Sequence, residues 1–252
     1  MQAIISDIHG NLEALEAVLE DIEGQKVDEI LCLGDVVGYG PNPVECLDIA
    51  MEKFKWVLMG NHEWALINQP VGFSPAAKAA IEITRRIFEE AEDDEETKQK
   101  RMDFISGLEP IQEDSILMFV HGSPKDPIMD YVFPEQFSRF WSDDRVDELL
   151  KDVRWACFCG HSHIPCIISS AYDSIVPLED VEKHELDRDM RYIINSGAVG
   201  QPRDRNPKAS YLILDRRKVT FRRVEYDHET TAAKIRELGF DEKLATRLAE
   251  GT

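Results

Sequence analysis

The sequence predicts a single α/β domain built from two packed β-sheets with helices on their outer faces. Two observations lead to this expectation. Over the first half of the chain, short apolar runs alternate with segments of helical periodicity, which is typical of layered α/β domains. Over the second half, several predicted strands follow one another without helices between them, and a simple doubly wound sheet does not allow this pattern.

The first half of the chain contains the alternating elements. Residues 3–5 form a predicted strand, and apolar side chains at helical spacing predict a helix from Leu12 that ends near Gly24. The next expected elements are a strand at 29–33, a helix at 43–53, a strand at 56–59 and a helical region at 74–107. That region contains the densest acidic run, from Glu89 to Glu96, which we interpret as a solvated helix end or loop.

The second half supplies most of the remaining strands. They are expected at residues 116–120, 156–159, 164–169, 192–195, 211–215 and 219–226. The charged segment 178–191 is interpreted as a surface excursion. Residues 229–250 have helical periodicity, and Gly239 divides them into two short helices. The expected organisation is a domain over 1–228 and a helical extension over 229–252 packed on it.

The charge balance limits the partners that the protein can have. Its 252 residues include 49 acidic and 29 basic side chains, which give a net charge of −20. Like charges repel, so we expect neither nucleic acid nor a membrane as a partner. No apolar run reaches the roughly 18–20 residues that span a bilayer, and the N-terminus does not read as a secretory signal. We therefore expect a cytoplasmic protein, and the sequence leaves its oligomeric state open.

Five cysteines are expected to be buried thiols in a reducing compartment, because their number is odd and the chain is long enough for a full core. Cys157 and Cys159 lie on one face of a predicted strand. A metal clip is one interpretation of this pair. Core packing is favoured because the surrounding residues are apolar.

Polar side chains gather where five predicted strands end in glycine-containing turns. The motifs are Asp7-x-His9 with Gly10, Gly34-Asp35, Gly60-Asn61-His62-Glu63, His121-Gly122 and Gly160-His161-x-His163. Each motif alone is an ordinary turn or helix cap. In open α/β sheets, however, ligands bind outside the carboxyl ends of strands, so the joint order of the motifs favours one assembled site.

The residue types in these motifs indicate a metal site. Carboxylate and amide oxygens mixed with imidazole nitrogens suit first-row divalent ions, with Mn²⁺ favoured and Fe²⁺, Zn²⁺ or Ni²⁺ as alternatives. Seven side chains are candidate ligands, which is too many for one ion. They are Asp7, His9, Asp35, Asn61, His121, His161 and His163. Two ions that share a bridging carboxylate would use all of them.

The ordered motifs D-x-H, G-D, G-N-H-[DE], H-G and G-H-x-H resemble those of the calcineurin-like metallophosphoesterase superfamily. The resemblance implies a four-layer α/β/β/α sandwich of two mixed sheets, with a dinuclear metal site between them. It assigns the ligands of the first ion as Asp7, His9, Asp35 and His163. It assigns those of the second ion as Asp35, Asn61, His121 and His161, so that Asp35 bridges.

The same resemblance implies catalytic roles beside the metal ligands. His62 resembles the general acid of the family, with its ring oriented by Glu63 or another nearby carboxylate. The alternative for His62 is a polar contact that stabilises the fold. The implied reaction is in-line attack on phosphorus by a metal-bridging hydroxide.

One departure from the wider superfamily narrows the substrate. Protein serine/threonine phosphatases and the symmetrical diadenosine tetraphosphatases that resemble them carry an arginine shortly after this Gly-Asp pair, whereas this chain has Gly38 and Tyr39. The strings GYGPNP (38–43), HGSP (121–124) and NSGAVGQPR (195–203) resemble a prokaryotic subgroup often labelled phosphodiesterase-like or related to diadenosine tetraphosphatase. Arg203 is the candidate replacement arginine, and Asn195 and Tyr131 are weaker substrate-binding candidates. An exposed arginine in a structured turn is an equally good interpretation of Arg203.

The sequence therefore predicts a dinuclear metal-dependent hydrolase of a phosphodiester, phosphoanhydride or phosphomonoester. A small nucleotide-type substrate is favoured, because the acidic chain would repel long polyanions. One alternative is a serine/threonine protein phosphatase, and the missing arginine counts against it. A non-catalytic scaffold of the same fold is the other, and the retention of His62 and of every predicted ligand counts against that.

Overall fold

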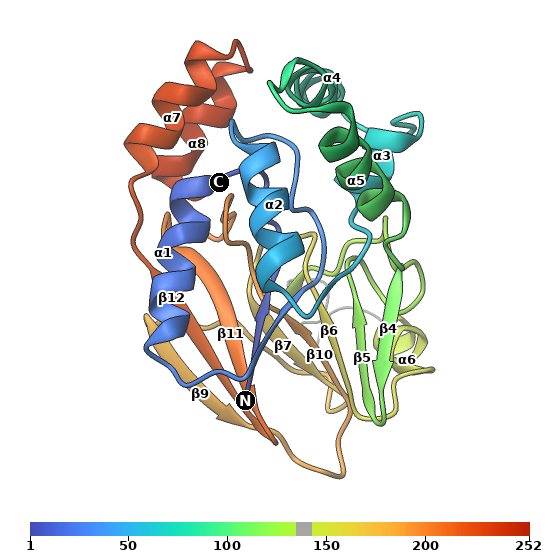
Figure 1. The fold of residues 1–252 in the computed structure, drawn as a ribbon. Coiled ribbons are helices and arrows are strands. Elements are labelled where there is room, and N and C mark those ends of the chain that lie inside the picture. Colours follow the sequence, from blue (N-terminus) through green and yellow to red (C-terminus); the bar gives the residue numbers. More distant parts are fainter. Residues whose placement is uncertain (135–142) are drawn as a thin grey trace.

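Two β-sheets packed face to face form the centre of the protein, and helices cover both outer faces (Figure 1). The computed structural model describes residues 1–134 and 143–252. Within these residues the strands form two six-stranded mixed sheets. This arrangement confirms the predicted four-layer α/β/β/α sandwich.

The first sheet consists of both N-terminal and C-terminal strands. Its members are β1 (Gln2–Ile5), β2 (Glu29–Cys32), β3 (Trp56–Val57), β9 (Val181–Glu185), β11 (Ala209–Asp215) and β12 (Lys218–Val224). Their order across the sheet is β3-β2-β1-β11-β12-β9. Strands β1, β2 and β3 are parallel, whereas β11 runs antiparallel to β1. The carboxyl ends of the first three strands therefore lie at one edge.

The second sheet contains the middle of the chain. Its members are β4 (Ile111–Asp114), β5 (Leu117–Val120), β6 (Ala156–Cys159), β7 (Cys166–Ser169), β8 (Ser174–Ile175) and β10 (Tyr192–Asn195). Their order is β4-β5-β6-β10-β7-β8. Strands β5, β6 and β10 are parallel, so their carboxyl ends also meet at one edge.

Helices fill the outer layers and cover the edge where the strands end. They are α1 (Leu12–Glu23), α2 (Pro43–Lys53), α3 (Asn61–Ile67), α4 (Pro75–Glu90), α5 (Glu95–Ser106), α6 (Asp143–Leu150), α7 (His228–Glu237) and α8 (Glu242–Glu250). Helices α1 and α2 pack on the first sheet, and α6 packs on the second. None of the helices in the described residues is both long enough and apolar enough to cross a bilayer.

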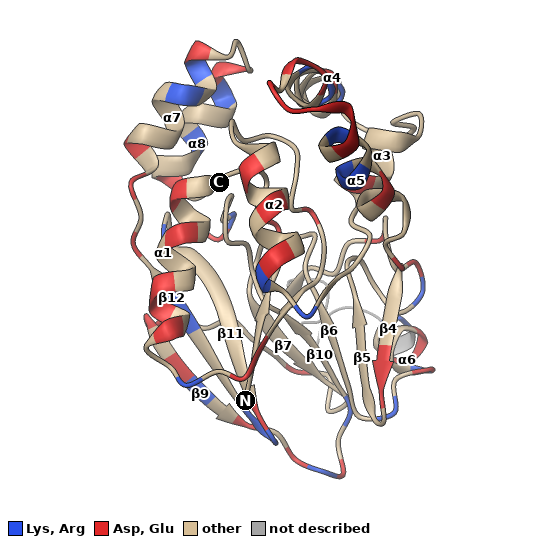
Figure 2. Ribbon diagram, in the orientation of Figure 1, with Lys and Arg blue, Asp and Glu red and all other residues tan. Residues whose placement is uncertain are grey.

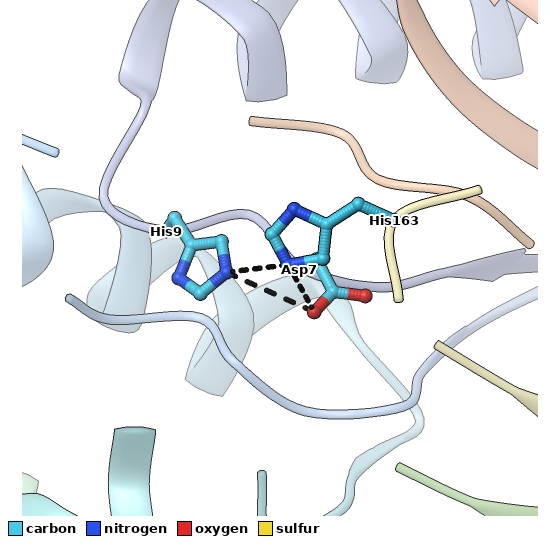
Figure 3. A group of neighbouring side chains, drawn as sticks. All are labelled: Asp7, His9 and His163. Carbon is cyan, nitrogen blue, oxygen red and sulfur yellow. Dashed lines mark hydrogen bonds and ion pairs between the residues drawn. The ribbon is translucent and has the colours of Figure 1, made fainter. Parts of the chain in front are cut away.

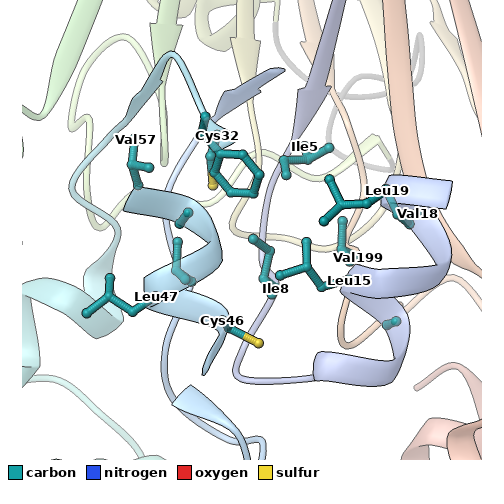
Figure 4. Close-up of a cluster of buried hydrophobic side chains, with 14 of the residues drawn as sticks. Ile5, Ile8, Leu15, Val18, Leu19, Cys32, Cys46, Leu47, Val57 and Val199 are labelled. Carbon is teal, nitrogen blue, oxygen red and sulfur yellow. The ribbon is translucent and has the colours of Figure 1, made fainter. Parts of the chain in front are cut away.

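Alternation along the strands separates the cores. In β1, Ala3 and Ile5 face the helices, where Leu15 and Leu47 join the cluster shown in Figure 4. Ile4 points the other way, into the core between the two sheets. Cys157 and Cys159 lie in the third core, beneath α6. All five thiols are buried, which confirms core packing as the interpretation of the Cys-x-Cys pair.

The C-terminal helices dock on the beginning of the chain. Asn11 caps α1 by accepting a hydrogen bond from the backbone N–H of Ala14, and its amide donates to the carbonyl of Gly200 at 2.8 Å. The hydroxyl of Thr231 in α7 donates to the same Asn11 side chain at 3.0 Å. Ala80 of α4 shares a buried apolar cluster with α7 and α8. The helices of residues 229–252 therefore lie against α1 and α4, at the end of the molecule where the strand motifs converge.

Several expected boundaries were wrong. Segment 178–191 is not only a surface excursion, because β9 pairs with β12 along the sheet edge, where its charged side chains discourage further strand pairing. Strand β4 and helix α6 were not expected. The helical region 74–107 is two helices, since Ala91 adopts an extended backbone and Asp94 caps α5. The predicted turn at residues 60–63 is the start of α3.

The acidic run from Glu89 to Glu96 spans the end of α4, a short loop and the start of α5 (Figure 2). Its side chains are mostly exposed, as expected for a solvated segment. Arg101 of α5 is the main anchor, because its side chain is only 6% exposed and bonds both oxygens of Asp48 at 2.7 Å. A third bond at 2.7 Å joins it to Asp93. Arg101 therefore fixes α5 against α2.

We expect Arg101→Gln to lower the free energy of unfolding by about 1–2 kcal/mol, because charge-assisted hydrogen bonds are lost while their carboxylate partners are partly exposed. Urea unfolding followed by circular dichroism measures this change. Lys100→Gln is the matched control on the same helix. It removes an exposed pair with Glu96 and should change the free energy by less than about 0.5 kcal/mol. Equal effects of the two substitutions would contradict an anchoring role.

Candidate metal centre

Loops that follow β1, β2, β5 and β6, together with the start of α3, bring all seven predicted ligands together. Backbone bonds join the first two loops, since the N–H of His9 donates to Asp35 and that of Gly10 donates to Val36, both at 2.8 Å. Five ligands adopt left-handed backbone, with φ between 50° and 63°. They are Asp7, His9, Asp35, His161 and His163. Such a conformation costs about 1–2 kcal/mol per residue, so the fold stores strain where it aims these side chains.

The first ligand group consists of Asp7, His9 and His163 (Figure 3). The Nε2 atoms of His9 and His163 are 3.1 Å apart. Asp7 Oδ1 lies 3.1 Å from His163 Nε2 and 3.7 Å from His9 Nε2. The three side chains are almost completely buried, so their inner atoms face one small volume.

The second group contains Asp35, His121 and His161, with Asn61 beside them. His121 Nε2 lies 3.1 Å from His161 Nδ1, 3.0 Å from Asn61 Oδ1 and 3.4 Å from Asp35 Oδ2. Asp35 Oδ2 is also 3.6 Å from Nε2 of His9 in the first group. A single carboxylate oxygen of Asp35 therefore lies between the two groups.

The outer nitrogen of each histidine bonds to a backbone carbonyl. His9 Nδ1 contacts Val37 at 3.2 Å, and His121 Nδ1 contacts Leu33 at 3.1 Å. His163 Nδ1 contacts Gln201 at 2.5 Å, and His161 Nε2 contacts Met129 at 3.2 Å. A carbonyl oxygen only accepts hydrogen bonds, so each outer nitrogen carries the proton. In the neutral rings the inner nitrogens are lone-pair donors, the form in which histidine binds metals.

The two carboxylates follow the same division. Asp7 Oδ2 accepts from the backbone N–H of His161 at 3.0 Å, and Asp35 Oδ1 accepts from that of His62 at 2.8 Å. The inner oxygen, Asp7 Oδ1, is buried without a hydrogen-bond partner despite its nearness to His163. Inner atoms about 3 Å apart match neighbouring ligands of one ion with bonds of roughly 2.0–2.1 Å. The donor set therefore fits divalent cations.

Electrostatics in the cluster favour ionised carboxylates and mostly neutral imidazoles. Burial raises the pKa of Asp7 and Asp35, but the adjacent histidine charges outweigh it and hold both values well below the usual range. Burial lowers the pKa of His161 to about 3. For His121, burial is outweighed by the charge of Asp35, which raises the pKa to about 9. A cation bound at this ring would displace its proton.

Glu63 does not orient the His62 ring as the sequence resemblance implied. Its buried carboxylate accepts three backbone N–H groups, those of Asp35, Val37 and Gly60, at 2.8–3.1 Å. Burial and the nearby charge of Asp35 raise its pKa to about 7. Because both oxygens are already bonded to backbone, Glu63 ties the loop after β2 to the start of α3.

Packing, rather than a carboxylate partner, holds His62. Its ring lies 4.3 Å from the Tyr39 ring and 4.7 Å from the His9 ring, centroid to centroid. Its Nδ1 is buried with no hydrogen-bond partner among the described residues. Burial lowers the pKa of His62 to about 4. The alternative nearby carboxylate is Asp35, whose oxygen lies within 4.8 Å of a His62 ring nitrogen.

The three predicted substrate-binding residues occupy different positions. Asn195 is fully buried, and its amide is committed to Gly160, Ser162 and Gly197, so this expectation was wrong. Its role is to hold the loop that carries His161 and His163. Tyr131 stacks on the ring of His161 with centroids 3.7 Å apart and remains 40% exposed.

Arg203 lies beside the cluster, because its backbone N–H donates to the carbonyl of His163 at 3.3 Å. Its Nη2 donates to the side-chain oxygen of Gln201 at 3.0 Å, while the backbone carbonyl of Gln201 holds His163. This position is not that of an exposed arginine in a remote turn.

Three neighbours of the site escaped the sequence reasoning, namely Tyr39, Gln201 and Arg247. Tyr39 has a left-handed backbone, with φ of 59°, and packs on His9 and His62. Arg247 arrives from α8 and donates to Gln201 at 3.1 Å. In the string NSGAVGQPR (195–203), only Arg203 is a residue type that indicates phosphate binding, so Gln201 does not stand out. No local pattern in the C-terminal helices distinguishes Arg247 from a solvated arginine.

Comparison with known proteins gives consistent matches over the whole chain. A family model described as calcineurin-like phosphoesterase matches residues 3–194. An uncharacterised protein of Methanocaldococcus jannaschii is 37% identical over 260 residues, covering 100% of this chain and 98% of that protein. The crystal structure of a metallophosphoesterase from Sphaerobacter thermophilus has a TM-score of 0.82 at 37% identity, covering 100% and 99% of the two chains.

A hypothetical protein from Pyrococcus horikoshii OT3 shares the fold, with a TM-score of 0.69 at 20% identity and coverage of 100% and 99%. The stretch matched by the family model contains all seven predicted metal ligands. It ends before Arg203 and before the two C-terminal helices. The family model therefore covers the candidate metal cluster but neither Arg203 nor Arg247.

Gly38 leaves the space that His62 occupies, and its replacement tests that packing. A Cβ there would lie 2.0 Å from His62 Nδ1, and φ is +89°. We expect Gly38→Ala to cost at least about 1–3 kcal/mol more than Gly72→Ala. Gly72 has a similar φ of +86° with nothing near its missing Cβ, so it isolates the backbone strain. Urea unfolding of both variants measures the difference, and equal costs would contradict close packing at His62.

Proposed function

Since this chain belongs to the calcineurin-like phosphoesterase family, we propose that it is a dinuclear metal-dependent phosphohydrolase acting on small nucleotide-type substrates. The cleaved bond is a phosphoanhydride, phosphodiester or phosphomonoester. The catalytic unit in this proposal is residues 1–228, and residues 229–252 are a helical extension packed on it. Mn²⁺ is the proposed ion, although Fe²⁺, Zn²⁺ and Ni²⁺ suit the same ligands.

One observation carries the proposal. The inner nitrogens of His9 and His163 approach to 3.1 Å although their outer nitrogens bond to carbonyls. Two lone pairs at this distance repel unless a positive charge lies between them. The bridging position of Asp35 Oδ2 favours two ions that share one ligand. When bound, such ions supply positive charge to the phosphoryl oxygens and lower the pKa of a coordinated water.

The residues of the chain supply the remaining chemistry. His62 is the proposed proton donor to the leaving oxygen, and Asn61 brings it to the cluster as the adjacent residue of α3. A phosphate dianion beside His62 would raise its pKa, since negative charge favours the imidazolium. Arg203 is proposed to hold the phosphoryl oxygens, and Tyr131 is proposed to line the entrance where it covers His161.

The charge distribution supports a small substrate. Acidic side chains occur on most helices, including the exposed ends of α4 and α5 (Figure 2). A long polyanion would meet these charges before it reached the buried cluster. A small phosphorylated molecule needs only the cationic pocket itself. A serine/threonine protein phosphatase is disfavoured, because this chain has Gly38 and Tyr39 after the Gly34-Asp35 pair, where those phosphatases carry a phosphate-binding arginine.

We expect hydrolysis of p-nitrophenyl phosphate or bis(p-nitrophenyl) phosphate that requires added Mn²⁺ and disappears on chelation. Absorbance of released nitrophenolate and metal content by mass spectrometry provide the two readouts. Asp35→Asn should abolish turnover and lower the metal content, because Asp35 serves both ions. His184→Ala is the matched control, since this histidine lies on β9 away from the cluster.

The metal content also separates the enzyme from its main alternative. A wild-type protein with both sites occupied and no turnover on either substrate would favour the non-catalytic scaffold. Loss of metal from His184→Ala would instead indicate that binding is not confined to the seven ligands.

For His62→Ala, we expect turnover to fall about 10²–10⁴-fold while the metal content stays near that of the wild type. The physical reason is loss of the proton donor to the leaving oxygen without loss of a ligand. A substrate whose leaving group needs no proton, such as p-nitrophenyl phosphate, should be affected less than phenyl phosphate. Unchanged activity on both substrates, with intact metal content, would refute the role of His62.

A further inference from the structure

Two arginines from distant parts of the chain meet on one side chain beside the metal centre. Arg203 Nη2 and Arg247 Nη1 both donate to the amide oxygen of Gln201, at 3.0 Å and 3.1 Å. Arg203 belongs to the loop before β11, whereas Arg247 belongs to α8. Because both guanidiniums contact the same oxygen, they are immediate neighbours.

No acidic side chain among the described residues pairs with either of these two positive charges. Within residues 1–134 and 143–252, neither Arg203 nor Arg247 pairs with an Asp or Glu side chain, although the chain contains 49 acidic residues. Arg247 Nε donates instead to the backbone oxygen of Thr252. Other half-buried arginines have carboxylate partners, as Arg222 has in Asp21. Arg203 Nε is buried without a hydrogen-bond partner. Burial and the charge of Arg203 lower the pKa of Arg247 to about 10, which reflects their repulsion.

The pair lies next to the metal cluster and extends away from it. Gln201 connects the two, because its backbone carbonyl holds the ring of His163. Arg203 is the nearer arginine, since its backbone N–H donates to the carbonyl of His163 at 3.3 Å. Arg247 instead reaches this region from α8, through its bond to the side chain of Gln201. The order from the ions outward is therefore Arg203 and then Arg247.

A cleft of about 340 Å³ continues from Arg247 between α4 and α8, which face each other in Figure 1. Tyr39 forms part of its wall, and the same ring packs on His9 and His62 on the metal side. Ala76 and Leu244 give the cleft apolar surface. It adjoins the arginine pair and has room for a group larger than phosphate.

We propose that Arg247 and Arg203 form a second anion subsite, which binds the phosphate next to the scissile one in a phosphoanhydride substrate. This assignment rests on the proposed function and makes α8 part of the substrate-binding surface. A guanidinium pair without an acidic side-chain partner matches the bidentate geometry and charge of a phosphoryl group. The organic end of the substrate would then occupy the cleft between α4 and α8.

The reaction at this site is hydrolysis of the anhydride. The water oxygen forms a bond to the scissile phosphorus, and the bond from that phosphorus to the bridging oxygen breaks. The bridging oxygen leaves with its electron pair on the second phosphate, which the arginine pair holds. The proton balance closes when the water loses a proton and the leaving phosphate, where protonated, gains one.

The series AMP, ADP and ATP tests the subsite, because it varies phosphate number with one nucleoside. Phosphate release is measured with the Mn²⁺-loaded protein at constant free Mn²⁺. We expect kcat/KM of the wild type for ADP to exceed that for AMP by at least about tenfold, the effect of one charge-assisted hydrogen bond. Arg247→Gln should remove most of this preference, chiefly through a higher KM for ADP.

Two further variants control for charge and folding. Arg236→Gln removes the same charge from α7, where Arg236 is exposed and paired with Glu242, and should keep the ADP preference. Arg247→Lys keeps the charge but loses the fork, and should give an intermediate ratio. An ADP-to-AMP ratio that Arg247→Gln leaves unchanged would overturn the subsite.

Arg247 also bonds the carbonyl of Thr252, so a variant that unfolds needs a second measurement. In the wild type, inorganic pyrophosphate should inhibit p-nitrophenyl phosphate hydrolysis at least about tenfold more tightly than phosphate, at the same free Mn²⁺. Equal inhibition constants would overturn the subsite even while the enzyme is active. Hydrolysis of none of these substrates would instead overturn the proposed function.

Discussion

Hydrogen bonds from four histidines to backbone carbonyls determine the chemistry of the metal centre. In a neutral ring, each bond fixes the proton on the outer nitrogen and so leaves a lone pair on the inner one. The carbonyls belong to loops at the ends of strands, and sheet pairing fixes those loops in turn. The carbonyls that bond His9 and His121 are those of Val37 and Leu33, which follow β2. One short segment therefore positions proposed ligands from both sheets. Shifting β2 against β1 would therefore misplace both ligand groups.

Glu63 holds together the loops that carry two of the proposed ligands, a role that its position next to His62 in the sequence does not indicate. Its carboxylate gathers three backbone N–H groups from two loops and is itself completely buried. Asp35, the proposed bridging ligand, lies in one of these loops, and Asn61, another proposed ligand, follows Gly60 in the other. These hydrogen bonds offset only part of the burial that raises the pKa of Glu63. A side chain expected to orient a catalytic ring instead sets the spacing of two metal ligands.

The sequence predicted the two-sheet fold and the seven side chains that meet at the strand ends, because both depend on local periodicity and on the order of motifs. It did not predict β9, whose pairing depends on β12 more than thirty residues away. Nor did it predict the left-handed backbone of Asp35 and His161, since loop geometry there is imposed by tertiary contacts. Asn195 was misassigned for a related reason, because its polar groups bond to the neighbouring loop and not to solvent.

The net charge of −20 and a cationic binding pocket are compatible, because they occupy different surfaces. Many acidic residues lie on exposed helices, where dissolved salt at physiological concentration screens their charges over about 8–10 Å. Arg203 and Arg247 are half-buried and share Gln201 without an acidic side-chain partner, so their charges are less screened than those on the exposed helices. An anion that reaches this corner relieves the repulsion between them. Relief of the repulsion between Arg203 and Arg247 therefore makes the binding of a second phosphate there more favourable.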